Sequence, residues 1–362
     1  MAGKRFLMAG GGTGGHVMPL LAVAEELRRR GHEPYFVGTR NGFEARLVPA
    51  RGFPIEYVEV SGFQGAGLAS KLKLLFQLPK SVLRCMSLIK QHRFRACFSL
   101  GGYVAGPPVI ASILKKIPLV VMEPNAMPGL VNRVFGRYAK KALLSFEAAR
   151  SHFNASAVEI SGLPVRDEFF RIEPKQRGPV FQVFVTGGSQ GSQTINRAIR
   201  ELWPLLAADP GLRVKIFHQC GRREEESLRE AFGDSDFAGR FEYELTAFVD
   251  DMPAAFAAAD LIICRAGAGT ISELMAAGRA SILIPYPYAA DDHQTRNAQA
   301  MLASGAGLFL TDRDCTGEAL FRLISNLAAD PAVLSRMASS ARALARPGAA
   351  ARAADILEEL AA

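Results

Sequence analysis

The 362-residue sequence has few cysteines, no long apolar run and almost no acidic residues in one segment. The five cysteines have no paired spacing, which disfavours disulfides and a zinc site and is typical of a reducing compartment. The longest uncharged stretch, residues 96–114, contains three glycines and two prolines and makes a poor membrane span. The N-terminus leads straight into strand-like KRFLMAG, so no signal peptide is indicated. Any contact with a membrane is expected at its surface.

Several signatures of phosphate and metal chemistry are also missing. No Gly-Lys-Ser/Thr accompanies the glycine run GGGTGGH at residues 10–16, which excludes a Walker loop there. The strand-like EPYFVGTR ends in Arg40, whereas a NAD site usually has an acidic residue for the ribose. Because an arginine suits NADP, an NADP-dependent oxidoreductase stays open as an alternative. The acidic pairs at 250–251 and 291–292 are typical of solvated or capping residues, so no bound metal and no cofactor is predicted.

Short apolar runs alternate with helical patterns along the whole chain, which indicates parallel sheets and an α/β fold. Two doubly wound Rossmann-like domains are predicted, with the boundary in the Pro-rich, charged stretch that begins at 161–166. The first domain spans residues 1–162, and the second spans 163–346. The amphipathic helix expected after Pro347 makes up residues 347–362. Both domains open with a strand, glycines and a helix, in AGGGTGGH and TGGSQGSQ.

The second domain offers two loops suited to a nucleotide. One is GGSQGS at 187–192, and the other lies in DLIICRAGAGTISELMAAG at 260–278. In the latter a strand is expected to end at Cys264 and a helix to open at 268–270, where free N–H groups favour a diphosphate. Glu273, one turn in, suits a ribose diol because a carboxylate accepts two hydroxyl hydrogen bonds; an ordinary helix acid is the alternative. Gln294 and Asn297 follow a strand end, where open α/β sheets bind ligands.

Five stretches together resemble the MurG-type cell-wall glycosyltransferases of family 28. They are AGGGTGGHVMPLLAVAEEL, SLGGYVAGPP, EPNAMPGLVNR, GGSQGSQTIN and CRAGAGTISELMAAGRASILIPYPYAADDHQTRNA, in family order across nearly the whole chain. The resemblance implies a GT-B fold, two Rossmann-like domains facing across a cleft, with the last helix crossing back to the first domain. It also implies inverting transfer of GlcNAc from UDP-GlcNAc to lipid I, undecaprenyl-diphospho-MurNAc-pentapeptide, giving lipid II for peptidoglycan.

Carried over residue by residue, the resemblance implies a set of substrate-binding positions. The backbone near Val249 reads the uracil, Glu273 takes the ribose hydroxyls, and Arg166 belongs to the donor contacts. The remaining positions hold the diphosphate or the sugar or face the cleft: Thr13, Gly14, Gly15, Asn125, Ser189, Ala268, Gly269, Thr270, Ile271, Ser272 and Gln294. The sequence departs from the family at Met122, Pro124 and Leu163, where the family often has His, Gln and Asn.

An inverting transfer needs a base for the acceptor 4-hydroxyl and stabilisation of the charge that grows on the diphosphate. Histidine titrates near neutrality, and His16 ends the glycine run, so we predict His16 as the base. The alternative is a helix-start histidine that only hydrogen-bonds the loop or the acceptor diphosphate. A non-catalytic sugar-nucleotide sensor at the membrane explains the same features with His16 as a bystander.

The positive charge is concentrated in one segment of the first domain. The formal net charge is +8, and residues 60–146 contain thirteen Lys and Arg against a single acid, Glu123. Residues 68–95 mix these cations with apolar residues, which favours an anionic membrane surface. Leucines that simply pack in the core are the alternative. Nucleic acid is not predicted as a partner, because the stretch has no recognised module and no interleaved aromatics. We therefore expect a peripheral protein on the cytoplasmic face of the cell membrane.

Overall fold

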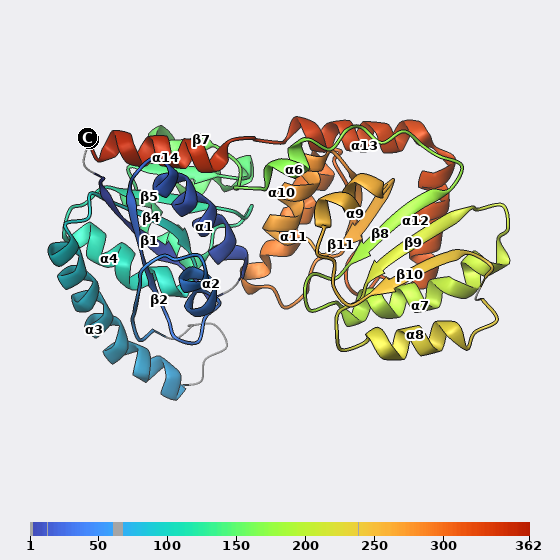
Figure 1. Cartoon of the computed structure of the whole chain (residues 1–362), viewed down its shortest axis with the longest axis horizontal. Helices are drawn as coiled ribbons and strands as arrows, with labels where there is room; N and C mark the ends of the chain where they lie inside the picture. Colours follow the sequence, from blue (N-terminus) through green and yellow to red (C-terminus); the bar gives the residue numbers. More distant parts are fainter. Residues whose placement is uncertain (1–2, 13, 61–67, 238) are drawn as a thin grey trace. The chain divides into compact units, whose positions relative to one another are not determined.

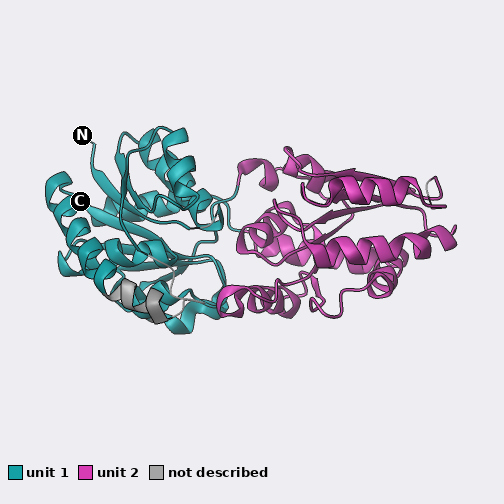
Figure 2. Cartoon of the chain, turned by 90° about the horizontal axis from the view of Figure 1, so that it is seen from below, with its two compact units in different colours: residues 1–165, 346–362 teal, residues 166–345 magenta. Residues whose placement is uncertain are grey.

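The computed structural model describes residues 3–12, 14–60, 68–237 and 239–362, and the side chains at 68–75 and 155 lie outside that description. The chain divides into two compact units (Figure 2). Unit 1 comprises Met1–Val165 and Arg346–Ala362, and unit 2 comprises Arg166–Ala345.

Unit 1 is built on a parallel sheet, which has seven strands in the described residues, in the order β3-β2-β1-β4-β5-β6-β7. The strands are β1 Arg5–Gly10, β2 Glu33–Gly38, β3 Ile55–Tyr57, β4 Ala96–Gly101, β5 Leu119–Glu123, β6 Lys141–Leu144 and β7 Val158–Ile160. The helices are α1 Gly14–Arg29, α2 Glu44–Ala50, α3 Leu68–His92, α4 Gly106–Leu114, α5 Leu130–Phe135 and α14 Ala349–Leu360, with short 3₁₀ turns at Tyr103–Ala105, Gly136–Tyr138, Glu147–His152 and Ala155–Ala157.

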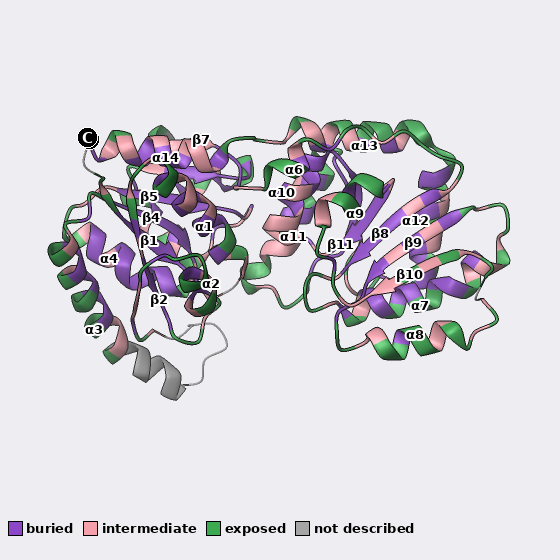
Figure 3. Cartoon of the chain, viewed as in Figure 1, coloured by how far each residue is buried: buried purple, intermediate pink, exposed green. Residues whose placement is uncertain are grey.

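The strands of unit 1 are largely buried (Figure 3), and their side chains alternate between two apolar layers. Phe6 and Met8 pack in one buried cluster with residues of α1 and α14, whereas Leu7 and Ala9 pack in a second cluster with residues of α3 and α4. Burial on both faces is the arrangement expected of a parallel sheet. The strand order reverses between β1 and β4, and ligands of such sheets bind beyond the carboxyl ends of the strands at that point.

The last helix of the chain, α14, belongs to unit 1, where it packs beside α1 (Figure 1). Ile356 and Leu357 are fully buried in the unit 1 core. Arg30, the residue directly after α1, donates to Asp355 at 2.6 Å and to Glu358 at 2.7 Å. The helix is thus tied down by apolar burial and by a charge-assisted network that joins the two ends of the sequence.

Unit 2 repeats the plan with a parallel sheet of six strands in the described residues, in the order β10-β9-β8-β11-β12-β13. The strands are β8 Phe181–Thr186, β9 Val214–Gln219, β10 Glu242–Thr246, β11 Leu261–Cys264, β12 Ala280–Leu283 and β13 Leu308–Phe309. The helices are α6 Asp167–Phe170, α7 Gln193–Ala208, α8 Glu225–Gly233, α9 Met252–Ala258, α10 Ala268–Ala277, α11 His293–Ala303, α12 Gly317–Ala329 and α13 Pro331–Ala343, with a 3₁₀ turn at Ala290–Asp292.

The order of unit 2 reverses between β8 and β11, so the turns after these two strands lie at its switch point. These turns are the GGSQGS and RAGAGT stretches that the sequence singles out. None of the helices in the described residues is long and apolar enough to cross a membrane.

Candidate functional site

The glycine turn after β1 is closed on one side by a buried carboxylate. Glu44, which opens α2, is 1% exposed and accepts the Gly12 N–H at 2.8 Å. It also accepts the N–H and the hydroxyl of Thr39 at 2.9 and 2.8 Å. A Cβ atom at Gly11 would lie 2.5 Å from the Glu44 carboxyl carbon, and one at Gly12 would lie 2.8 Å from the Tyr103 ring. The protein's own packing therefore requires these two glycines.

His16 lies in the first turn of α1, which begins at Gly14. Its ring is half-buried, and a Cβ atom at Gly102 would lie 3.8 Å from the ring atoms Cδ2 and Cε1. Gly101 and Gly102 have φ values of 80° and 76°, which lets the turn after β4 approach the imidazole closely. The carboxyl ends of β1 and β4 thus bring the predicted base beside a side-chain-free turn.

The other predicted residues of the first turn differ in their surroundings. A Cβ atom at Gly14 would meet no heavy atom within 4 Å, and Gly15 is exposed. The first N–H groups of a helix have no intrahelical partner, so this end of α1 is accessible to an acceptor group. The predicted position Thr13 lies outside the described residues.

Asn125 is held in place by Glu123, the last residue of β5. The Glu123 carboxylate is 1% exposed and accepts the N–H of Asn125 at 2.9 Å and its side-chain amide at 3.2 Å. It also accepts the Gly129 N–H at 3.1 Å and the Asn132 amide at 2.9 Å. Burial raises the pKa of Glu123 to about 7, against the lowering effect of these hydrogen bonds. Glu123 therefore organises the whole EPNAMPG turn.

The three departures from the family pattern have a structural setting. Met122 and Leu163 belong to the buried apolar cluster of unit 1, and Pro124 is buried as well. Residues that fill the core at these positions leave the accessible part of the turn to Asn125, which is half-buried.

In unit 2, the turn after β11 leaves the start of α10 open. The strand ends at Cys264 and the helix begins at Ala268, as the sequence predicts. A Cβ atom at Gly267 or at Gly269 would meet no heavy atom within 4 Å. The first backbone N–H groups of α10, including those of Gly269 and Thr270, are thus available for an anion, which the helix dipole also favours.

The residues that follow in α10 divide between the core and the accessible side. Ile271 is fully buried, so its side chain is part of the packing. Ser272 is 4% exposed, and its hydroxyl is buried without a hydrogen-bond partner among the described residues. Glu273 is half-buried, and burial raises its pKa to about 7, opposed by the charge of Arg166. Arg166 itself is exposed and stacks its guanidinium over the Phe169 ring at 5.2 Å.

The GGSQGS turn after β8 is anchored by a buried polar network. A Cβ atom at Gly191 would lie 1.8 Å from the carbonyl oxygen of Cys220, the residue that follows β9. The turn after β8 and the turn after β9 therefore pack backbone to backbone. Asn196 donates to that carbonyl at 3.0 Å, and the His218 ring bonds Asn196 at 3.0 Å. Burial lowers the pKa of His218 to about 3, which keeps it neutral. Ser189 is exposed at the tip of this anchored turn.

The two remaining predicted residues lie beyond β10 and β12. Val249, 8% exposed, lines a cavity of about 450 Å³ whose walls include Phe217 and Phe248. Gln294, at the start of α11, accepts the Tyr286 N–H at 2.9 Å. Both follow carboxyl ends of the unit 2 sheet, on the same edge as the α10 start. Among the described residues, no group of three or more His, Cys, Asp or Glu side chains is placed to hold a metal ion.

Comparison with known proteins decides the family. Residues 6–144 match the glycosyltransferase family 28 N-terminal domain, and residues 182–360 match the family's C-terminal domain. The chain belongs to glycosyltransferase family 28.

Relatives of this family 28 chain match it over nearly its full length. It is 52% identical to the UDP-N-acetylglucosamine--N-acetylmuramyl-(pentapeptide) pyrophosphoryl-undecaprenol N-acetylglucosamine transferase of Solibacter usitatus, over 98% of this chain and 96% of that protein. The protein of the same name from Myxococcus xanthus is 40% identical over 98% and 93%. The crystal structure of Acinetobacter baumannii MurG matches with a TM-score of 0.82 and 32% identity, covering 98% and 99% of the two chains. The GT-B-like fold predicted from the sequence is confirmed. Because the chain belongs to a family of glycosyltransferases, the alternative of an NADP-dependent oxidoreductase is no longer supported.

Within each unit of this family 28 chain, the structure gathers the predicted residues at one sheet edge. Unit 1 brings Gly14, Gly15, His16 and Asn125 to the carboxyl ends of β1 and β5. In unit 2, Ser189 and residues 268–273 follow β8 and β11, whereas Val249 and Gln294 follow β10 and β12 and Arg166 directly precedes α6. Sequence reasoning missed two supporting carboxylates, Glu44 and Glu123. The second had a signal, since it is the single acid of residues 60–146.

Proposed function

We propose that this family 28 protein transfers GlcNAc from UDP-GlcNAc to the 4-hydroxyl of MurNAc in undecaprenyl-diphospho-MurNAc-pentapeptide, which converts lipid I to lipid II in peptidoglycan synthesis. The observation that carries the proposal is the 52% identity, across 98% of the chain, to a transferase whose name states this donor and acceptor. The products are lipid II and UDP.

Unit 2 is the proposed donor site. The open N–H groups of Gly269 and Thr270 receive the diphosphate, and Ser189 adds a hydroxyl from the anchored GGSQGS turn. Glu273 accepts the ribose hydroxyls; it is half-buried, and no protein hydrogen bond to it is present in the described residues. We assign uracil recognition to the backbone near Val249, and further donor contacts to Arg166 and Gln294.

Unit 1 is the proposed acceptor site, and His16 is the proposed base. The acceptor 4-oxygen forms its bond to C1 of GlcNAc while the bond from C1 to the diphosphate oxygen breaks, so the anomeric centre inverts. His16 takes the proton of the 4-hydroxyl, and UDP leaves with the electron pair of the broken bond. The charge that grows on the diphosphate is stabilised by the α10 N–H groups and the helix dipole. Asn125, fixed by Glu123, contacts the sugar.

The exposed face of α3 supports docking of unit 1 on an anionic membrane. Phe76 is 80% exposed and Leu83 is 65% exposed, and both lie on the helix side away from the buried residues Val82 and Cys85. Lys80 shares this face but lies 3.9 Å from Glu59, so acids just before residue 60 offset part of the local charge. Side chains at 68–75, which the sequence includes in the patch, lie outside the described residues. We infer a peripheral protein of the cytoplasmic membrane face.

The proposed reaction is tested with labelled UDP-GlcNAc and lipid I. The expected result is labelled lipid II, with UDP released in equal amount. Binding of UDP-GlcNAc without transfer would overturn the proposal and support the sensor alternative. Stabilisation against heat by NADPH and not by UDP would overturn it in favour of an oxidoreductase.

Membrane docking is tested separately with liposomes at low salt. We expect retention on anionic liposomes, and a several-fold loss of retention for Phe76→Ser/Leu83→Ser, because each side chain then buries no apolar area in the bilayer. Leu114→Ser is the matched control, since Leu114 is also 58% exposed on unit 1 but lies on α4. Equal retention of all three proteins would remove the α3 face from the proposal.

A further inference from the structure

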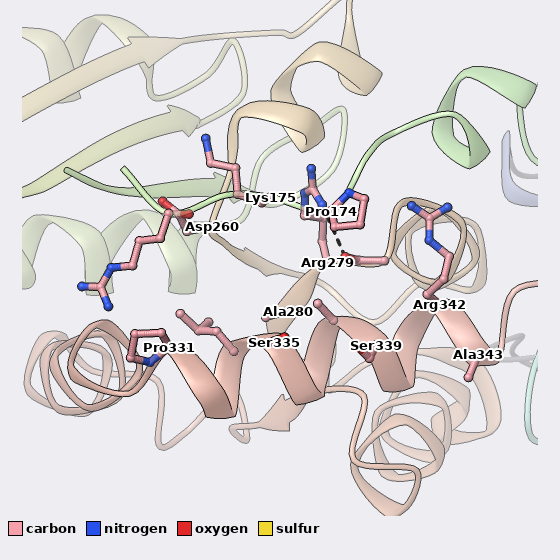
Figure 4. A pocket seen from close by; sticks show the side chains of 14 residues that line it. Pro174, Lys175, Asp260, Arg279, Ala280, Pro331, Ser335, Ser339, Arg342 and Ala343 are labelled. Carbon is pink, nitrogen blue, oxygen red and sulfur yellow. Dashed lines mark hydrogen bonds between the residues drawn. The ribbon is translucent and has the colours of Figure 1, made fainter. Parts of the chain in front are cut away.

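A cavity of about 600 Å³ lies in unit 2, away from the turns described above (Figure 4). Its walls come from the segment before β8, from the starts of β11 and β12, and from α13. Asp260 and Ala280 mark those strand starts, whereas the proposed donor turns follow the ends of β8 and β11. Since β11 alone spans about 13 Å, at about 3.3 Å per residue, the cavity and the donor turns lie at opposite edges of the sheet.

Four cations line this cavity: Lys175, Arg177, Arg279 and Arg342. Of the described residues that line the cavity, one is acidic, Asp260. One of its carboxylate oxygens accepts the Gln182 N–H at 2.8 Å. In the described part of the chain, no ion pair within 4.0 Å involves any of the four cations. The cavity is therefore lined by charge that the protein itself leaves largely uncompensated.

Two of the cations are fixed by backbone carbonyls. Arg279, 3% exposed, donates to the Phe256 carbonyl at 2.8 Å and to the Ala257 carbonyl at 3.1 Å, near the end of α9. Arg342 donates to the carbonyls of Ala276 and Ala277, which end α10. Burial, with the neighbouring Arg342 charge, lowers the pKa of Arg279 to about 10, so the Arg279 guanidinium stays charged at neutral pH.

A rough charge balance leaves the cavity positive. Each helix end contributes a partial charge of about −0.5, so α9 and α10 together offset about one of the four positive charges. Asp260 offsets one more. About two positive charges remain, which is close to the charge of about −1.5 to −2 on a phosphate monoester at neutral pH.

The opposite wall supplies hydroxyls and apolar surface. Ser335 and Ser339 lie one helical turn apart on α13 and are exposed, and in the described structure neither hydroxyl has a protein partner. Leu334 and Pro331 of the same helix also line the cavity. Figure 4 shows Ser335 and Ser339 on the α13 side of the cavity and Lys175 and Arg279 on the opposite side, with the Lys175 side chain extending away from α13. A volume of this order suits a small organic ligand.

We propose that this cavity is a second binding site, distinct from the donor site, for a soluble phosphate-bearing small molecule. Lys175 and Arg177 contact the phosphate directly: in the described residues neither donates a hydrogen bond, and the Arg177 guanidinium lies over the Phe181 ring, 5.8 Å from its centre, with its N–H groups unused. Arg279 and Arg342 act through their fixed charge, and the α13 hydroxyls complete the phosphate's hydrogen bonds. The apolar part of the wall accommodates the organic part of the ligand.

The proposal is tested by calorimetric titration of the full-length protein with pyrophosphate and with glycerol 3-phosphate, at low salt and with saturating UDP-GlcNAc. The excess UDP-GlcNAc occupies the proposed donor site, and its diphosphate has no terminal phosphate to compete for the cavity, so binding that remains belongs elsewhere. We expect binding of both probes, and at least tenfold weaker binding by Lys175→Gln/Arg177→Gln. Arg322→Gln/Arg336→Gln, which removes two exposed cations outside the cavity, is the control and is expected to bind as the unmodified protein does.

A second variant and a second readout keep the test independent of folding effects. Ser335→Glu places one acid on the cavity wall at an exposed position where glutamate favours helix, so it is expected to abolish binding without loss of thermal stability. Hydrogen exchange is expected to slow in residues 331–343 when either probe is added. Absence of binding, or equal binding by both cavity variants and the control, would overturn the proposal, as would slowed exchange confined to the α10 start.

Discussion

The two units open with the same pattern of strand, glycine turn and helix, yet the two turns are built differently. In unit 1, Glu44 and Tyr103 fill the space beside Gly11 and Gly12. In unit 2, Gly267 and Gly269 face open space at the start of α10. The first turn is thus a packed support that carries a histidine, and the second is an open row of N–H donors.

The same contrast holds for the two carboxylates whose pKa is raised to about 7. Glu123 in unit 1 receives four hydrogen bonds from its own turn, so the protein itself uses its acceptor capacity. Glu273 in unit 2 has Arg166 as its charged neighbour and is half-buried. A glycine-rich turn or a buried acid therefore does not by itself mark a ligand site. Its N–H groups or carboxylate oxygens can bind a ligand only where other protein atoms do not already occupy them.

The largest expected effect tests whether the glycine turn of unit 1 supplies the general base of the reaction through His16. His16→Ala is expected to lower turnover by about 10²- to 10⁴-fold, because general base catalysis contributes that much, while UDP-GlcNAc affinity stays within about twofold. Initial rates at saturating substrates and a binding titration measure the two quantities. His152→Ala removes another half-buried histidine of unit 1 and is expected to keep full activity. Near-normal turnover of His16→Ala would assign the first turn to binding alone.

The next effect concerns the packed carboxylate. A raised pKa means that folded Glu123 holds its proton to higher pH than the unfolded chain does, so its contribution to stability is full below about pH 4.5 and falls until about pH 7. A shift of about 2.5 units corresponds to about 3 kcal/mol in the free energy of unfolding. Glu123→Gln removes this decline, whereas the decline due to Glu273 remains in both proteins. Urea unfolding of both at pH 4.5 and 7.5 measures the difference, and equal pH dependence would contradict it.

A pair of glycine substitutions compares the turns directly. Gly11→Ala places a Cβ against the hydrogen-bonded Glu44 carboxylate and is expected to lower the free energy of unfolding by about 1–3 kcal/mol. Gly269→Ala meets no atom and favours helix, so stability should rise by up to about 1 kcal/mol while the KM for UDP-GlcNAc increases. Denaturant unfolding and donor kinetics separate the two outcomes. Equal stability losses in both variants would mean that the turns are packed alike.

Some parts of this contrast between the two turns can be predicted from the sequence and others cannot. The difference lies in how far apart along the chain the interacting residues are. The end of β11 at Cys264 and the start of α10 at Ala268 are local features, and the sequence predicts both. The short strands β3 and β7 give too few residues for a period and were not predicted. The role of Glu44 depends on β2 lying beside β1, which brings residue 44 to residue 12, and no local pattern reports that distance.

The candidate site shows the same limit. The resemblance to the family predicts site residues such as Asn125 and Gln294. It does not predict the buried hydrogen bonds that hold the site turns in place, which are those of Glu123 in unit 1 and of His218 with Asn196 in unit 2. His218 and Asn196 are ordinary polar residues in sequence, and only burial in a common core makes them partners. The basic cavity of unit 2 is invisible in sequence for the same reason, since its four cations come from positions as distant as 175 and 342.

The smallest expected effect tests whether Glu273 is as open as its surroundings indicate. With a pKa near 7, the carboxyl group is about half protonated at pH 7, and ribose hydroxyls that donate to it favour the charged form. UDP binding at pH 7 is therefore expected to release up to about half a proton. Calorimetry in buffers of different ionisation enthalpy measures this release.

Glu273→Gln should lose the release and bind UDP about ten- to a hundredfold more weakly, because a charge-assisted hydrogen bond is worth about 1.5–3 kcal/mol. Glu123→Gln should keep the release, since that carboxylate is satisfied within its own turn. Undiminished release from Glu273→Gln would place the titrating group elsewhere and remove the distinction between the two carboxylates.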